Sequence, residues 1–173
     1  MAHPPEIQTL LDKQAIYDVL ARYSRGVDRA DVDLVAGCYH PDATENHGGT
    51  FTGTAADYLA AMREVLPASG IMTHNLSNVL IELDADKAIA ESYNLAFVRM
   101  VKRGETFDTL THARAVDEFE RRDGEWRIAA RHLTYEWNIE LPFNETWARG
   151  IITKTPEVLV RGGKKPNDIL YGR

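Results

Sequence analysis

The second half of the chain consists of four long segments with a strand-like period of two, joined only by short turns. The segments are Gly70–Leu83, Ala88–Val101, Thr106–Arg121 and Trp126–Ile139. The last turn contains Asp123-Gly124, a strong hairpin signal between two such segments. Parallel strands need crossovers of a dozen or more residues, which these turns cannot supply. The pattern therefore predicts an antiparallel meander and excludes a Rossmann-type parallel sheet.

Three helices are predicted before this meander. Apolar residues recur at helical spacing from Ile7 to Val27, over about five turns. A short second helix is expected over Val32–Cys38, and a third begins at the capping-box-like Thr54-Ala-Ala-Asp57 and stops at Pro67. A short strand and a glycine-containing turn are expected over Thr44–Phe51. Helices followed by strands indicate an α+β domain with the helices on one face of the sheet.

Composition narrows the class of protein. The chain has 173 residues, 44% hydrophobic and 27% charged, which suits one globular domain. Its net charge of −6 argues against nucleic acid or an anionic membrane as a partner, and no apolar stretch approaches the ~20 residues of a spanning helix. The N-terminus lacks the form of a signal peptide, so a cytoplasmic location is expected. Cys38 is the only cysteine, which excludes an internal disulfide.

A curved sheet covered by helices is expected to enclose a cavity for a small molecule. Strand alternation predicts that Met72, His74, Leu76, Asn78 and Leu80 share one face. The cavity walls are expected to take Tyr93, Leu95, Phe97 and Arg99 from the second strand, His112 and Arg114 from the third, and Arg131, Leu133, Tyr135 and Trp137 from the last. Among these, with Tyr23 of the first helix, we expect the substrate-binding residues to be Tyr23, Tyr93, Phe97, His112 and Trp137.

His74 and Asp28 are the candidates for chemistry. Asp28 falls in the last turn of the first helix, where an anion costs about 0.3–1 kcal/mol. It either pairs with Arg25 on the surface or serves another group. His74 is either a hydrogen-bonded core residue or a base. A histidine held by a carboxylate is a general base, and without a G-x-S-x-G motif the remaining chemistry is proton abstraction with elimination. Arg131 would stabilise negative charge, or else it is a surface residue.

Other kinds of site find less support. His40, Glu45 and His47 flank one loop, but their spacing matches no zinc pattern. No spacing supports a two-histidine, one-carboxylate iron site, and no phosphate-binding loop is present. We therefore expect neither a metal nor a cofactor.

Four segments resemble the SnoaL-like branch of the NTF2-like superfamily. They are Leu11–Asp28, Tyr39–Ala43, Thr73–Asn78 and Phe119–Ile128. The resemblance covers roughly residues 6–140 and implies a cone of three helices packed on a strongly curved, mixed, mostly antiparallel sheet. This NTF2-like fold adds the short strand near Thr44 to the meander. Residues 1–140 would form the domain, and residues 141–173 a C-terminal extension that acts as a lid or as an arm between subunits.

The resemblance is strongest, in its site pattern, to scytalone dehydratase and hexachlorocyclohexane dehydrochlorinase. Their Asp–His dyad falls on Asp28 and His74, and the dehydrochlorinase-like arginine falls on Arg131. This implies a cofactor-independent lyase that removes a proton from a hydrophobic, aromatic or cyclic molecule and expels water, halide or a small carbonyl such as formaldehyde. It also implies a homotrimer, or else a homodimer. The superfamily leaves two alternatives open: a non-catalytic small subunit of an aromatic-ring dioxygenase, and an isomerase or polyketide cyclase.

Overall fold

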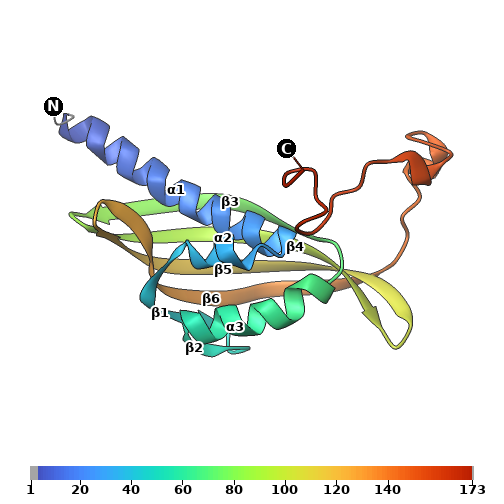
Figure 1. The fold of residues 1–173 in the computed structure, drawn as a ribbon, viewed down its shortest axis with the longest axis horizontal. Coiled ribbons are helices and arrows are strands. Elements are labelled where there is room, and N and C mark those ends of the chain that lie inside the picture. The colour runs from blue at the N-terminus through green and yellow to red at the C-terminus, as the bar shows by residue number, and fades with distance from the viewer. Residues whose placement is uncertain (1–3, 173) are drawn as a thin grey trace.

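Helix α1 (Pro5–Arg29) lies along one face of a curved six-stranded sheet, as the computed structural model in Figure 1 shows. The structure describes residues 4–172. Helix α2 (Val32–Ala36) and helix α3 (Ala55–Val65) follow α1 on the same side of the sheet, and a 3₁₀ turn (Leu66–Ala68) ends α3. The three predicted helices are thereby confirmed.

Side chains at the predicted positions cap the two shorter helices. The Asp31 carboxylate accepts a hydrogen bond from the backbone nitrogen of Leu34 at the start of α2, at 3.3 Å. At the start of α3, Thr54 Oγ1 accepts from the backbone nitrogen of Asp57 at 3.1 Å and donates to the Asp57 carboxylate at 2.7 Å. Each cap satisfies a backbone donor that the first helical turn leaves free.

The sheet has the strand order β2-β1-β6-β5-β4-β3. The strands are β1 (Tyr39–His47), β2 (Thr52–Thr54), β3 (Met72–Asp84), β4 (Lys87–Lys102), β5 (Glu105–Arg122) and β6 (Glu125–Pro142). Strands β3 to β6 form the predicted antiparallel meander. Strand β1 pairs in parallel with β6 and antiparallel with β2, so the sheet is mixed and the expected α+β fold is confirmed.

A bulge in β3 corrects the predicted alternation of this strand. The register with β4 shifts by one residue between Ser77 and Leu80, and Asn78 has a positive φ of 47°. Up to Leu76 the even-numbered residues face the helices, but beyond the bulge the odd-numbered ones do. Ile81 is accordingly 8% exposed and Leu80 is 60% exposed. Asn78 and Leu80 therefore do not share the face of His74, because one extra residue reverses the pleat.

The core lies between α1, α2 and one end of the sheet. Ile16 and Leu20 of α1 pack in one buried cluster with Phe119 of β5 and Ile128 of β6. Burying side chains of this size stabilises the fold by about 1.5–3 kcal/mol each. The other end of the concave face is not filled in this way, and it forms the cavity described below.

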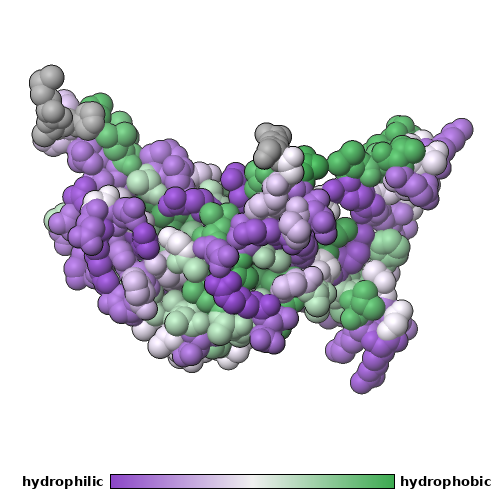
Figure 2. Space-filling model, in the orientation of Figure 1, coloured by the Kyte–Doolittle hydropathy of each residue, from purple (hydrophilic) through white to green (hydrophobic). Residues whose placement is uncertain are grey.

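The C-terminal extension leaves β6, runs away from the sheet and returns to the end of α1 (Figure 1). It contains two short 3₁₀ turns, Ala148–Gly150 and Pro156–Val158. Arg29 binds the returning segment twice: its carbonyl accepts from the backbone nitrogen of Lys165 at 2.7 Å, and its Nε lies 3.2 Å from the Asp168 carboxylate. Figure 2 shows apolar groups on the surface of the projecting part, where Ile151 is 87% exposed.

Within residues 4–172, no helix has both the length and the apolar character that crossing a membrane requires.

Candidate functional site

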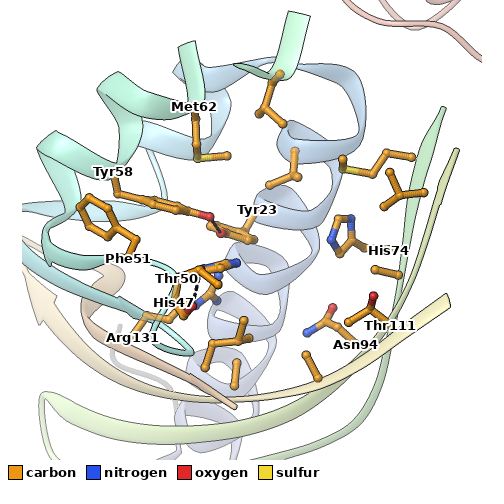
Figure 3. A pocket seen from close by; sticks show the side chains of 18 of the residues that line it. Tyr23, His47, Thr50, Phe51, Tyr58, Met62, His74, Asn94, Thr111 and Arg131 are labelled. Atoms are coloured by element: carbon orange, nitrogen blue, oxygen red, sulfur yellow. Dashed lines mark hydrogen bonds between the residues drawn. The ribbon is translucent and has the colours of Figure 1, made fainter. Parts of the chain in front are cut away.

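A cavity of about 440 Å³ lies between the concave face of the sheet, α1 and α3 (Figure 3). This volume is typical of small-molecule sites. Small side chains of the central strands leave the room for it, since Ala96, Ala113 and Ala115 form part of its wall. The remaining lining combines apolar side chains with polar ones, and the polar ones are Tyr23, His47, Thr50, Tyr58, His74, Asn94, Thr111, Arg131 and Tyr135.

Asp28 and His74 meet at one wall of this cavity. His74 Nδ1 lies 2.7 Å from Asp28 Oδ1, and the backbone nitrogen of His74 donates to Asp28 Oδ2 at 3.0 Å. Both side chains are largely buried, at 21% and 12% exposure. A carboxylate can only accept, so the imidazole hydrogen is on Nδ1 and the Nε2 lone pair is left free.

This geometry explains the acid at the unfavourable end of a helix. The Asp28 side chain is not used in a surface pair with Arg25, which was the alternative. It spans from α1 to β3, and its two oxygens bind one residue 46 positions away. The carboxylate thus fixes both the position of the strand and the orientation of the ring.

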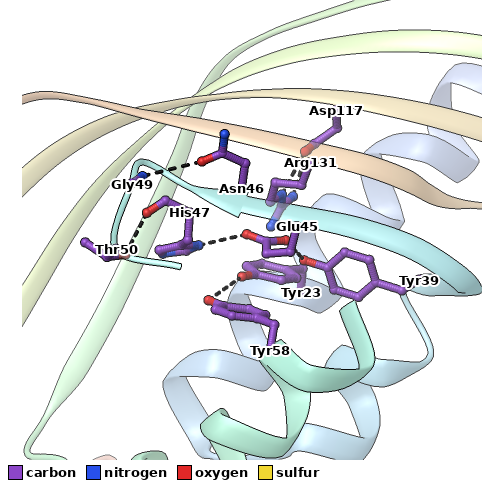
Figure 4. A network of polar contacts seen from close by, with 10 residues as sticks. All are labelled: Tyr23, Tyr39, Glu45, Asn46, His47, Gly49, Thr50, Tyr58, Asp117 and Arg131. Carbon is purple, nitrogen blue, oxygen red and sulfur yellow. Dashed lines mark hydrogen bonds and ion pairs between the residues drawn. The ribbon is translucent and has the colours of Figure 1, made fainter. Parts of the chain in front are cut away.

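A second histidine–carboxylate pair lies on another wall of the same cavity (Figure 4). His47 Nδ1 is 2.9 Å from Glu45 Oε1, and the Tyr39 hydroxyl donates to Glu45 Oε2 at 2.6 Å. Glu45 is 1% exposed, whereas the His47 ring lines the cavity and stacks on Tyr58 with their centroids 5.1 Å apart. Burial raises the pKa of the Tyr39 hydroxyl well above its usual value, so Tyr39 remains a hydrogen-bond donor to Glu45.

Arg131 is buried beside this pair and is 4% exposed. Its Nε and Nη2 donate to the two oxygens of Asp117, both at 2.7 Å, and its guanidinium lies 3.9 Å from the centre of the Tyr23 ring. Burial would lower the pKa of Arg131, but the negative charge of Asp117 raises it well above the usual value. Arg131 is therefore a permanent cation in the cavity wall and not a surface residue.

Tyr23 also lines the cavity, and its hydroxyl lies 3.3 Å from that of Tyr58. Burial raises the pKa of Tyr23, although the positive charge of Arg131 opposes the shift. Both phenols are neutral at physiological pH, and while one hydroxyl donates to the other, the second hydroxyl has its hydrogen free to donate into the cavity. Of the five expected substrate-binding residues, Tyr23 is the one that the structure brings to the dyad's cavity.

The other four lie on the opposite, convex face of the sheet, which corrects their expected placement. The rings of Tyr93, His112 and Trp137 stack on one another there, with centroids 5.1 and 5.3 Å apart. On β4, the residues that line the cavity are Asn94, Ala96 and Val98, and Phe97 alternates with them. The sequence predicts that bulky residues form the cavity wall. In the structure small residues form it, and the cavity exists because they leave room.

Trp137 is displaced from the cavity by a bulge. His112 of β5 pairs with Trp137, while the next residue, Ala113, pairs with Tyr135, so Glu136 is an extra residue on β6. Tyr135 lines the cavity together with Arg131 and Leu133, as expected. Beyond the bulge the alternation is reversed, and the indole of Trp137 points outward.

Sequence reasoning missed His47 as a cavity residue. It was considered only with His40 and Glu45 as a metal-binding loop. In the structure His40 Nε2 contacts the backbone carbonyl of Glu120 at 2.9 Å and does not join the other two. Among the described residues, no group of three potential metal-binding side chains converges. The i, i+2 spacing of Glu45 and His47 on a strand was the available signal, because it places both on one face.

None of the described residues after Tyr135 lines the cavity, so the extension does not cover it in this conformation. Its residues Arg161–Lys164 instead form a separate groove with Asp28, Arg29 and the start of β3. Lys164 Nζ donates to Ser69 Oγ there at 2.8 Å.

Solved structures share this architecture. A type 2 hexachlorocyclohexane dehydrochlorinase, LinA, is 23% identical with a TM-score of 0.72, over 81% of this chain and 97% of that one. The type 3 LinA from Novosphingobium barchaimii LL02 is 22% identical with a TM-score of 0.71, over 81% and 99%. A putative scytalone dehydratase from Novosphingobium aromaticivorans DSM 12444 is 21% identical with a TM-score of 0.69, over 79% and 91%. At these identities the likeness shows the fold.

A search among curated proteins gave no match. The family model described as a SnoaL-like domain matches residues 8–132, which include most of α1, strands β1 to β5, the part of β6 up to His132 and both histidine–carboxylate pairs. The chain therefore belongs to the SnoaL-like domain family, within the NTF2-like fold that its sequence resembles.

Proposed function

We propose that this protein is a cofactor-independent lyase in which His74 removes a proton from a hydrophobic, aromatic or cyclic small molecule. The observation that carries the proposal is the 2.7 Å contact between His74 Nδ1 and Asp28, at the wall of a largely apolar cavity of about 440 Å³. A free imidazole nitrogen can accept a proton from a carbon acid, and an apolar cavity can hold a hydrophobic substrate beside it.

Asp28 would contribute in two ways. Because its oxygen accepts from Nδ1, it keeps the ring in the tautomer whose Nε2 can accept a proton. After the transfer, its negative charge stabilises the imidazolium, as an orienting aspartate does in other histidine-based sites. The second bond, to the backbone nitrogen of His74, holds the ring and the carboxylate in register before substrate binds.

Arg131 and Tyr23 would stabilise the negative charge that develops as the leaving group departs. Two of the Arg131 nitrogens bind Asp117, which leaves the Nη1 hydrogens for another partner. Preorganised donors in a water-poor cavity stabilise such charge strongly. Water, halide or a small carbonyl compound such as formaldehyde would be expelled. The names of two structural relatives, a dehydrochlorinase and a putative dehydratase, denote eliminations of this kind and support the proposal.

The base can be tested without knowing the natural substrate. The probe is 5-nitro-1,2-benzisoxazole, a flat aromatic molecule that opens to a coloured phenolate when a base takes its ring C–H proton. We expect the wild-type protein to accelerate this opening beyond an equal concentration of free imidazole. His74→Gln and Asp28→Asn should each lower kcat/KM by about 10²–10⁴-fold, the usual cost of losing a general base.

Two matched variants serve as controls. His132→Gln and Asp33→Asn make the same chemical changes at exposed positions outside the cavity lining, and both should retain the wild-type rate. A wild-type protein no faster than imidazole, or a His74→Gln variant with full activity, would contradict the proposal.

A further inference from the structure

Two histidine–carboxylate pairs face one cavity, and they come from different elements. His74 of β3 is held by Asp28 of α1. His47 at the end of β1 is held by Glu45 of the same strand (Figure 4), and Figure 3 shows both histidine rings at the cavity. In each pair the carboxylate binds Nδ1, and Nε2 makes no hydrogen bond to any described residue. Both rings line the cavity, so each can exchange a proton with a bound molecule.

Glu45 belongs to a group of buried charged side chains in which acids outnumber bases. Glu45, Arg131 and Asp117 lie side by side on β1, β6 and β5, because Arg131 is the cross-strand partner of both acids. Glu45 and Asp117 are 1% and 0% exposed, yet they share a single guanidinium, whose bonds go to Asp117. A buried charge without a counter-charge is costly.

The other groups around His47 supply no positive charge to these two acids. They are the ring of Tyr135 and the phenols of Tyr58, Tyr23 and Tyr39, and burial raises the pKa of these three phenols, which keeps them neutral at physiological pH. The row therefore consists of two acids and one arginine, and the His47 ring is a further basic side chain in contact with it.

The surroundings of Asp28 differ from those of Glu45. Arg29 follows Asp28 in the chain, and Lys164 of the extension shares a groove with it. Burial lowers the pKa of Lys164, and the negative charge of Asp28 opposes that shift, which places the ammonium within electrostatic reach of the carboxylate. Asp28 therefore has two cationic side chains near it in addition to the histidine that it binds.

We propose that His47, positioned by Glu45, is a second catalytic residue: a general acid that protonates an oxygen leaving group while His74 acts as the base. The inference rests on the proposed lyase function and specifies its substrate class. Halide leaves as a stable anion and needs no proton, whereas hydroxide and alkoxide are poor leaving groups unless they are protonated. The pair thus points to β-hydroxy or β-alkoxy carbonyl compounds.

The protons balance in this scheme. His74 Nε2 takes the proton from carbon, and the C–H electron pair becomes the new double bond. The bond from carbon to oxygen breaks with its electron pair on the oxygen, which takes the proton from His47 Nε2 and leaves as water or an alcohol. His74 then carries one proton more and His47 one fewer, and exchange with solvent restores both.

The experiment compares two probes that share one ring system and differ in the basicity of the oxygen that leaves. 5-Nitro-1,2-benzisoxazole releases a weakly basic nitrophenolate, and unsubstituted 1,2-benzisoxazole releases a more basic phenolate. The readout is kcat/KM for the nitro compound divided by kcat/KM for the unsubstituted compound, both measured at one pH. In His47→Gln we expect this ratio to rise on the order of 10-fold or more, because a general acid matters most for the poorer leaving group. Glu45→Gln should raise the ratio in the same direction.

Three comparison variants separate the roles. His74→Gln should lower both rates together and leave the ratio unchanged. Tyr39→Phe removes the other hydrogen bond of Glu45 but keeps its contact with His47, so it should leave the ratio unchanged even if it lowers the melting temperature. His132→Gln, at an exposed position, should change neither rate.

The outcomes for the acid and the base are distinct. An unchanged ratio in His47→Gln and Glu45→Gln would overturn the general acid and leave the His74 base standing. If His74→Gln kept both rates, the lyase proposal itself would fail. If His47→Gln does not fold, as judged by circular dichroism, the ratio in Glu45→Gln decides.

Discussion

Asp28 binds His74 through both of its oxygens, one at the ring and one at the backbone nitrogen. An asparagine has one acceptor oxygen, so Asp28→Asn keeps both contacts only if the imidazole adopts its other tautomer, with the hydrogen on Nε2 and the lone pair on Nδ1. We expect the variant to lose about 1–3 kcal/mol of unfolding free energy, because two hydrogen bonds to a charged carboxylate become neutral ones.

The measurement for Asp28→Asn is urea unfolding followed by circular dichroism. The matched control is Asp33→Asn, whose carboxylate pairs with Arg63 at the surface, with 74% and 51% of the two side chains exposed. The control should change stability little. Equal stabilities of the two variants would mean that Asp28 contributes to the fold no more than a surface acid does.

Arg131 and Asp117 form an ion pair that is cut off from water, with side-chain exposures of 5% and 0%. Removing one partner leaves the other charged and unpaired in the protein interior. We expect Arg131→Met to lower the unfolding free energy by about 3–5 kcal/mol. Replacing both residues, as Arg131→Met with Asp117→Leu, should restore part of the loss, and urea titration of the three variants measures the coupling. A double variant less stable than Arg131→Met would contradict this.

Gly48 and Gly49 make a matched pair for testing the packing around His47. Both have positive φ, 59° and 82°, so alanine strains the backbone at either site. At Gly48 a Cβ would also lie 2.5 Å from the Tyr135 ring, whereas at Gly49 nothing lies within 4 Å. We expect Gly48→Ala to be the more destabilising and, by displacing Tyr135, to alter binding in the cavity. Thermal melting compares them, and equal melting temperatures would refute the contact.

Cys38 should report unfolding through its reactivity. The thiol is 1% exposed, and burial raises its pKa to about 11 from the usual 9.0. At pH 8 we expect slow reaction with a thiol reagent in the native protein and rapid reaction in denaturing urea. Because the folded state favours the neutral thiol, this contribution to stability is complete below pH 9 and is lost as the pH rises toward about 11. Rapid native labelling at pH 8 would contradict the burial.

Asp168 should anchor the C-terminal extension in a pH-dependent way. Hydrogen bonds from the backbone nitrogens of Gly163 and Leu170 hold the pKa of its carboxyl below the usual 3.8, and Arg29 adds to the shift. A lowered pKa means that the stabilisation is present above pH 3.8 and is lost as the pH falls below it. We expect Asp168→Asn to melt below the wild type at neutral pH and the two to converge in acid. In hydrogen exchange, the Lys165 amide should be less protected in the variant.

The sequence was sufficient for the fold because its local signals agree with one another. The helical spacing of α1, the Thr54 cap of α3 and the Asp123-Gly124 turn each specify an element, and the family resemblance supplied the parallel partner of β6. Asp28 and His74 were found by the same route: a charge at the wrong end of a helix needs a partner, and the resemblance indicated which one.

The errors were of two kinds. On β4 and β5 the bulky side chains were assigned to the cavity face, which the small ones line. On β3 and β6 the strand pairing has one residue too many. Alternation was carried unbroken through Asn78 and Glu136, but a bulge at each reverses the faces beyond it. The residue types of one strand do not predict such a bulge, because it depends on the pairing with the neighbouring strand. His47 was missed for a different reason, because its contact with the cavity depends on where α3 places Tyr58.

The extra residue at Glu136 also limits how this strand can change. Deletion of this one residue would move the indole of Trp137 to the other face of the strand, next to Ala113. The cavity would then be obstructed by the largest of the natural side chains. The capacity of the site for a guest is thus set by the number of residues in β6 as much as by their identity.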